Sequence, residues 1–223
     1  MRNLLIKRGV AGLFAILILA GFSFLIGEVY GAQYLVNVNT SSVNGSSGYL
    51  DFQFNPGGLD SQSANVTITG FTGGVLGGAP VVAGNVTGTL PGTVWFVNNQ
   101  PYNDYFQDFT YGNAFSFIVS LAGPALESPN GTSATSSTFL VGLYDNSQIP
   151  ILTTDFSGSV GAIDINLDGT TTSTSFPMSE GSGSVVTFDE LTVPEPCTLL
   201  LLAVGMGILY WQGRSRHTRH KKF

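Results

Sequence analysis

The side chains that could bind a metal most directly are Asp164, Asn166 and Asp168, which occupy alternate positions and are followed by Gly169. Carboxylate and amide oxygens spaced in this way before a glycine are typical of a calcium-binding loop. These three residues are therefore candidate Ca²⁺ ligands. Such a loop is completed by a bidentate glutamate eleven residues after its first aspartate, and this chain has Ser175 at that position.

The same segment has a second interpretation, because Ile163, Ile165 and Leu167 alternate with its polar residues. Alternating apolar and polar side chains are typical of a half-buried strand, and an Asp-Gly pair is a common turn. We therefore favour a strand that runs into a turn, and we keep calcium binding as the alternative.

Asp104 and Asp108 form a second candidate pair, since two carboxyl groups can act as the acid and the base of a glycoside hydrolase. A four-residue gap brings the two carboxyl groups together only if the segment is helical. The neighbouring tyrosines and amides would instead suit a sugar-binding surface, by stacking and hydrogen bonding. We assign no catalytic residue, and a carboxylate-dependent glycoside hydrolase remains the least favoured function.

Between Arg8 and Arg214 the chain contains no lysine, arginine or histidine, and its one cysteine is Cys197. Ser-His-Asp, Cys-His and lysine-dependent catalysis therefore lack their base or nucleophile in this part of the chain. Zinc sites lack histidine and cysteine, and no glycine-rich loop is followed by a phosphate-binding lysine. An enzyme would have to depend on carboxylates alone, so we predict that the protein is not an enzyme.

The distribution of charge separates the two ends of the chain from its middle. All eight lysine and arginine residues lie at the ends, and thirteen of the fourteen acidic residues lie between residues 33 and 196. Nucleic acid and anionic lipid are poor partners for such a segment, because it has no cation to meet a phosphate. Cations such as Ca²⁺ and neutral glycans are the partners that its charge allows.

The N-terminal end predicts a secretory signal peptide. A basic start is followed by an apolar stretch from Val10 to Ile26 and then by a short polar region. Val29 and Gly31 are small enough for the −3 and −1 positions of a signal-peptidase site, which predicts cleavage after Gly31 or Ala32. Because the apolar stretch is long for a signal peptide, an uncleaved anchor helix is the alternative.

The C-terminal end predicts a transmembrane helix over the apolar segment Thr198–Trp211, which a basic tail follows. Fourteen helical residues span about 21 Å, which is less than a hydrocarbon core of about 30 Å. Either flanking residues extend the membrane-spanning helix or the bilayer becomes thinner around it. Tyr210 and Trp211 suit the membrane interface, and the basic tail suits the cytoplasmic side. A buried core helix is the alternative.

Directly before this apolar segment the chain reads Val193-Pro194-Glu195-Pro196. The motif, the apolar segment and the basic tail, in that order, resemble the PEP-CTERM sorting signal of Gram-negative bacteria. The resemblance covers residues 193–223 and implies that exosortase, a membrane-embedded cysteine transpeptidase-like enzyme, cuts near the motif. The two prolines fit this role because they exclude regular structure around Glu195. Two features depart from the family pattern: Cys197 replaces the usual serine or alanine, and the basic tail is long and interrupted.

Between the two ends, short alternating or β-branched runs are separated by glycine, proline and asparagine clusters. This pattern predicts an antiparallel β-sandwich or jelly-roll-like domain over residues 33–192, with a signal helix in residues 1–32 and a transmembrane helix in residues 193–223. Within it, Phe52 and Phe54, and likewise Phe115 and Phe117, should point to one face of a sheet. The expected strands are 34–40, 48–54, 64–71, 82–90, 93–97, 114–121, 138–144, 160–167 and 184–188.

The segments GYLDFQFNPGG, LPGTV and NDYFQDFTYGNAFSF are also similar to a group of exported PEP-CTERM proteins of unassigned function, which implies one β domain and no activity. We expect a protein that crosses the inner membrane, is anchored in it transiently, and reaches the cell surface or extracellular matrix. Signal peptidase and exosortase are its expected partners, and a structural role with exopolysaccharide or biofilm its expected function. The alternative is a carbohydrate- or calcium-binding adhesion module of the same fold.

Overall fold

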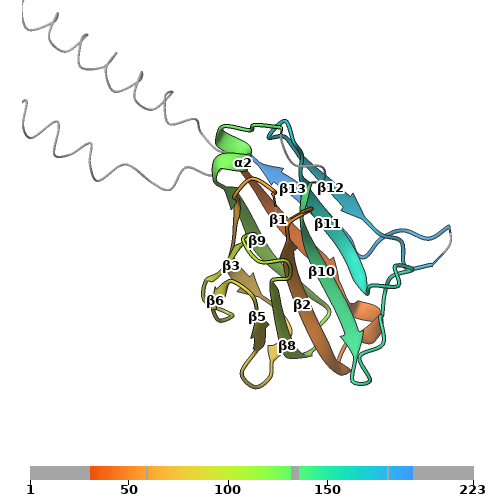
Figure 1. Cartoon of the computed structure of the whole chain (residues 1–223). Coiled ribbons are helices and arrows are strands. Elements are labelled where there is room, and N and C mark those ends of the chain that lie inside the picture. Colours follow the sequence, from red (N-terminus) through yellow and green to blue (C-terminus); the bar gives the residue numbers. More distant parts are fainter. Residues whose placement is uncertain (1–30, 59, 132–135, 180, 193–223) are drawn as a thin grey trace, which may run out of the picture.

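Two antiparallel β-sheets packed face to face make up the domain (Figure 1). The computed structural model describes residues 31–58, 60–131, 136–179 and 181–192. Val29, the predicted sorting motif and both predicted membrane-associated segments lie outside these residues. Among the described residues, no helix is long and apolar enough to cross a membrane. The all-β, antiparallel class expected from the sequence is confirmed.

We call the six-stranded sheet sheet A and the seven-stranded sheet sheet B. In spatial order, sheet A contains β13 (Val186–Leu191), β1 (Ala32–Asn39), β9 (Ala114–Ala122), β3 (Asn65–Thr72), β7 (Val94–Val97) and β6 (Val86–Gly88). Sheet B contains β12 (Thr171–Ser175), β11 (Ser159–Ile165), β10 (Ser137–Asp145), β2 (Ser47–Asn55), β8 (Asp104–Thr110) and β4 (Val75–Leu76), while β5 (Val81–Ala83) also pairs with β8. Two single-turn helices, η1 (Ser41–Val43) and α2 (Pro124–Glu127), lie in the connections.

The core between the sheets is rich in aromatic side chains. Phe52 of β2 meets Phe117 of β9 with ring centroids 4.8 Å apart, so this contact joins sheet B to sheet A. Phe54 and Phe115, two residues away on the same strands, are buried as well. The expectation that each pair of phenylalanines shares one sheet face is therefore confirmed, because alternate residues of a strand point to the same side.

Two parts of the strand assignment differ from the expectation. The single strand expected over residues 82–90 is two strands, β5 in sheet B and β6 in sheet A, because the chain passes between the sheets at Gly84, where φ is +71°. The strands β4, β8 and β12 are not expected from the sequence. In β8 the polar Gln107 faces the core and the apolar Phe106 faces outward, against the usual alternation, and β12 has the sequence TTSTS, without an apolar side chain to mark its inner face.

The chain enters and leaves the sandwich side by side. The first strand, β1, pairs with the last strand, β13, and Gln33 lies opposite Leu191. Figure 1 shows both ends of the described chain at the end of the sandwich that carries α2. The Gly31 N–H donates to the Leu121 carbonyl at 2.8 Å, and β1 begins at Ala32. The first strand of the described domain therefore begins at the predicted signal-peptidase site.

Candidate functional site

The predicted calcium ligands lie in the hairpin between β11 and β12. Asp164, on β11, accepts a hydrogen bond from the Thr138 hydroxyl of β10. The amide nitrogen of Asn166 donates to the Thr170 hydroxyl at 3.0 Å, and an oxygen of Asp168 accepts from the Thr170 N–H at 3.0 Å. Asn166 and Asp168 thus stabilise the hairpin, whereas Asp164 is bound to the neighbouring strand β10.

The favoured interpretation of this segment is confirmed, since β11 ends at Ile165 and a turn containing Gly169, with φ of +83°, leads into β12. Among the described residues, no group of three or more histidine, cysteine, aspartate or glutamate side chains could hold a metal ion. The calcium alternative for this loop stays a prediction without geometric support in the hairpin.

Asp104 and Asp108 do not form the pair that a helix would create. Both lie on β8 and point to the same outer face of sheet B, and four residues along a strand cover about 13 Å. Asp104 instead meets Asp51 of the neighbouring strand β2. Asp51 lies opposite Phe106, and Gln53 lies opposite Asp104, so the two aspartates are diagonal neighbours on one face.

Asp51 reaches this face through the alternation of β2, in which Leu50 and Phe52 point into the core and Asp51 points outward. Despite this direction, Asp51 is only 4% exposed and Asp104 only 9%. The neighbouring strand contributes Gly142, which has no side chain, directly opposite Asp51. The vacant space lets the ring of Tyr144 lie close to Asp51, since a Cβ on Gly142 would come within 3.1 Å of both side chains.

The two carboxyl groups receive few hydrogen bonds. Gln53 donates from its amide to Oδ2 of Asp51 at 2.8 Å, and the Tyr144 hydroxyl lies 3.5 Å from the same oxygen while it bonds to the Ser157 carbonyl. The Oδ1 atoms of Asp51 and Asp104 are both buried, and neither has a hydrogen-bond partner among the described residues. Such orphan acceptors are rare in folded proteins.

Burial is the largest cause that raises the pKa of Asp51 to about 8, and the interaction with the Asp104 carboxyl and its charge contributes in the same direction. The hydrogen bonds from Gln53 and Tyr144 act in the opposite direction but are outweighed. Burial and the two carboxylates likewise raise the pKa of Tyr102 to about 12. In the absence of another cation, the pair therefore holds a proton at neutral pH.

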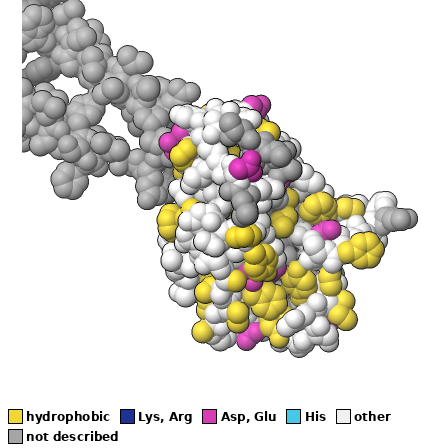
Figure 2. Space-filling view, in the orientation of Figure 1, with side chains coloured by type: hydrophobic (Ala, Val, Ile, Leu, Met, Phe, Trp, Pro, Cys, Tyr) yellow, Lys and Arg dark blue, Asp and Glu magenta, His cyan; other side chains and the backbone are white. Residues whose placement is uncertain are grey.

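Aromatic rings surround the acidic pair on the outer face of sheet B. Tyr49 and Phe106 stack with centroids 4.7 Å apart, and Phe106 lies 5.9 Å from Tyr144. Tyr102, which precedes β8, is 48% exposed. Figure 2 shows hydrophobic side chains gathered on this side of the molecule, with acidic side chains between them. We refer to Asp51 and Asp104 with these four rings as the acidic-aromatic cluster.

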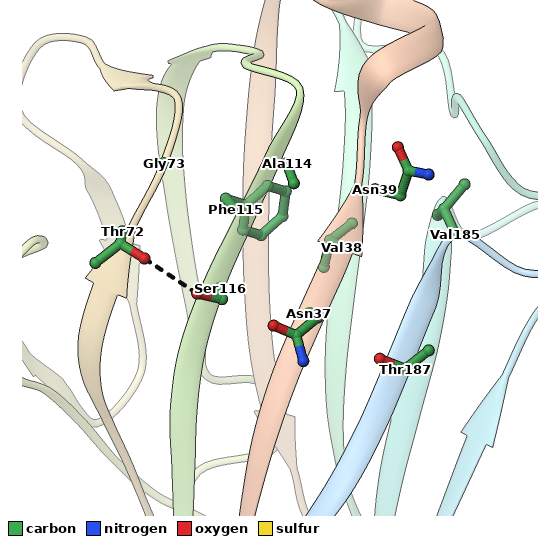
Figure 3. Close-up of a pocket in the computed structure, with 10 residues that line it drawn as sticks. All are labelled: Asn37, Val38, Asn39, Thr72, Gly73, Ala114, Phe115, Ser116, Val185 and Thr187. Carbon is green, nitrogen blue, oxygen red and sulfur yellow. Dashed lines mark hydrogen bonds between the residues drawn. The ribbon is translucent and has the colours of Figure 1, made fainter.

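A separate hollow of about 290 Å³ lies on sheet A, where β1, β3, β9 and β13 approach one another (Figure 3). Its polar side chains have partners within the chain: Thr72 bonds to Ser116 at 3.0 Å, and Asn37 donates to Asp189 at 3.3 Å. None of the described residues that line the hollow is charged. It offers no general acid or base, so the acidic-aromatic cluster is the stronger candidate for chemistry.

A scan against protein-family models, a search of curated proteins and a search of solved structures all find no significant match to this chain. The functional inference therefore depends on the residues and their geometry.

Proposed function

We propose that this protein is an exported, non-enzymatic surface or extracellular-matrix protein, sorted through its C-terminal segment and processed by signal peptidase and exosortase. The observation that carries the proposal is the pairing of β1 with β13, which places both ends of the described chain at one end of the sandwich. A domain attached to one membrane through segments before and after it needs its two ends on the same side. Ends at opposite poles would force the domain to lie along the membrane or its ends to unfold.

The position of the sorting motif is compatible with processing of a folded domain. The strand β13 ends at Leu191, and Val193 begins the motif two residues later. Cleavage near the motif would leave β13 in sheet A. In the proposal, residues 1–32 form a signal helix, Thr198–Trp211 spans the membrane transiently, and the basic tail stays in the cytoplasm.

The acidic-aromatic cluster supports a non-enzymatic role. A glycoside hydrolase needs two carboxyl groups that flank a bound sugar, whereas Asp51 and Asp104 are diagonal neighbours on one sheet face. Both carboxyl groups are also buried rather than open to a sugar ring. A structural role in the matrix, in contact with neutral polysaccharide, suits a domain that has no cationic side chain between residues 9 and 213.

The proposal is tested by replacing Pro194, Glu195 and Pro196 with alanine in cells that produce the protein, followed by fractionation. The wild-type chain should reach the cell surface or the medium, and the triple variant should accumulate at least tenfold in the inner-membrane fraction. Glu190→Ala, an exposed change on β13 shortly before the motif, is the control and should sort normally. Equal distribution of the triple variant and the wild type would contradict the sorting role of the motif.

A further inference from the structure

The acidic pair has no counter-charge within the body of the chain. Asp51 and Asp104 are at least nine-tenths buried, and the sequence contains no lysine, arginine or histidine between Arg8 and Arg214. Burying carboxylates without a compensating charge is strongly unfavourable. Their neutralising charge must therefore come from solvent, as a proton or as a metal cation.

The geometry of the pair provides two oxygens that a cation could use. Oδ1 of Asp51 and Oδ1 of Asp104 are buried without a hydrogen-bond partner in the described part of the chain. They come from adjacent strands and from diagonal positions on one sheet face. A buried acceptor without a donor needs an explanation, and a bound ion is one that accounts for both oxygens at once.

We propose that Asp51 and Asp104 bind a calcium ion on the outer face of sheet B, each through its unpartnered carboxylate oxygen. A divalent cation balances two carboxylates, and calcium prefers oxygen ligands in a flexible geometry. Magnesium is less suited, because it demands near-ideal octahedral geometry at shorter distances. With two charged ligands, the affinity belongs to the millimolar range of extracellular calcium modules.

Other oxygens can complete the coordination shell. Gln53 now donates its amide nitrogen to Asp51, and a rotation of that amide would direct its carbonyl oxygen to the ion instead. The pair is covered by outer-face side chains rather than by the core. Tyr102 is 48% exposed, and Tyr144 is held by a hydrogen bond to the loop carbonyl of Ser157. Movement of these side chains would admit water ligands without opening the sandwich.

This site differs from the calcium loop expected from the sequence. Asp164 accepts a hydrogen bond from Thr138 of β10, and Asn166 and Asp168 form hydrogen bonds within the β11–β12 hairpin. Asp51 and Asp104 belong instead to β2 and β8. The proposal does not depend on the export route, because it concerns the folded domain itself.

The test is the melting temperature of the full-length protein in nonionic detergent, after chelation and then with 10 mM CaCl₂, 10 mM MgCl₂ or NaCl of equal ionic strength. With millimolar affinity, calcium should raise the melting temperature by about 3–6 °C relative to NaCl, and magnesium by less. Asp51→Asn and Asp104→Asn should each abolish the calcium-specific shift.

Two matched controls separate this site from general charge effects. Asp108→Asn removes an exposed carboxylate from the same strand and the same sheet face as Asp104, and it should keep the shift. Asp164→Asn should also keep it, which would distinguish the site from the hairpin loop.

The proposal is overturned if calcium gives no greater shift than NaCl, or if Asp164→Asn abolishes the shift while Asp51→Asn keeps it. Isothermal titration of the wild-type protein provides a readout that does not depend on the folding of any variant. Absence of saturable calcium binding up to about 10 mM would leave the proton as the neutralising charge and would overturn the site.

Discussion

The buried Asp51 carboxyl makes the stability of the domain depend on pH. Its pKa is about 8 in the folded protein and 3.8 in a model peptide, which represents the unfolded chain. The folded state therefore binds this proton more tightly across the interval between these values. Its stabilising contribution is complete below about pH 4 and is lost as pH rises through about 8, at no more than about 1.4 kcal/mol per pH unit.

Asp51→Asn should remove most of this dependence, because the amide of asparagine stays neutral throughout. In the presence of a chelator, the wild-type free energy of unfolding should fall from pH 5 to pH 8 by about 1–4 kcal/mol, and that of the variant should change little. Urea unfolding of the full-length protein in detergent at pH 5, 6.5 and 8 measures both.

Asp108→Asn is the control for the unfolding experiment, because the Asp108 carboxylate is exposed on the outer face of sheet B, the face that also carries Asp51. It should leave the pH dependence of the wild type unchanged. A wild-type free energy of unfolding that stays constant or rises between pH 5 and pH 8 would show that Asp51 does not titrate as a buried acid.

At the scale of elements, the connection between β10 and β11 holds Tyr144 over Asp51. The Tyr144 hydroxyl bonds to the Ser157 carbonyl, and its ring packs against Gly158, where φ is +85°. A Cβ on Gly158 would lie 2.5 Å from Cε1 of that ring. Glycine is therefore required there for two reasons: the backbone conformation and the close approach of the tyrosine.

Gly158→Ala should lower the free energy of unfolding by about 2–5 kcal/mol, from backbone strain and from the collision with Tyr144. Gly45→Ala is the matched control, since Gly45 has φ of +81° and no atom within 4 Å of a built Cβ. It should lose about 1–2 kcal/mol, from strain alone. Chemical denaturation measures both losses, and equal losses would mean that Tyr144 does not pack tightly in this place.

Sequence patterns predict those strands in which apolar residues alternate with polar ones and mark the buried face. They do not predict contacts that depend on how neighbouring strands are aligned. The strands β2, β9 and β10 alternate clearly or are rich in β-branched and aromatic residues, so their faces can be assigned. The strand β8 is missed because the polar Gln107 faces the core and the apolar Phe106 faces outward, against the usual alternation.

The acidic pair itself was not predictable from local sequence. Alternation places Asp51 outward, which normally means exposure to solvent. Its burial depends on Gly142 and Tyr144, which lie about ninety residues later in the chain. The pairing with Asp104 depends on the register of β2 against β8. An aspartate within the apolar run GYLDFQF was the one available signal, and it identifies neither the partner nor the burial.

At the scale of the whole molecule, the strand topology accounts for how the basic ends of the sequence are joined to the acidic domain between them. The antiparallel pairing of β1 with β13 puts residues 32 and 191 at one end of an anionic sandwich, so the basic, apolar segments of the sequence are joined to the described domain at that same end. If both ends are removed at the predicted sites, the product keeps the strands β1 to β13, apart from Ala32 if cleavage follows that residue, and loses every lysine and arginine of the chain. Its net charge then becomes far more negative than the −6 of the full chain.

The most direct test of the account is the intact mass of the form that the cells release or display at their surface. We predict an N-terminus at Ala32 or Gln33 and a C-terminus close to Pro194–Pro196, so the segment Thr198–Trp211 and the basic tail should be missing. A released or surface form whose mass includes residues beyond Trp211 would contradict processing at the motif, and with it the proposed route to the surface.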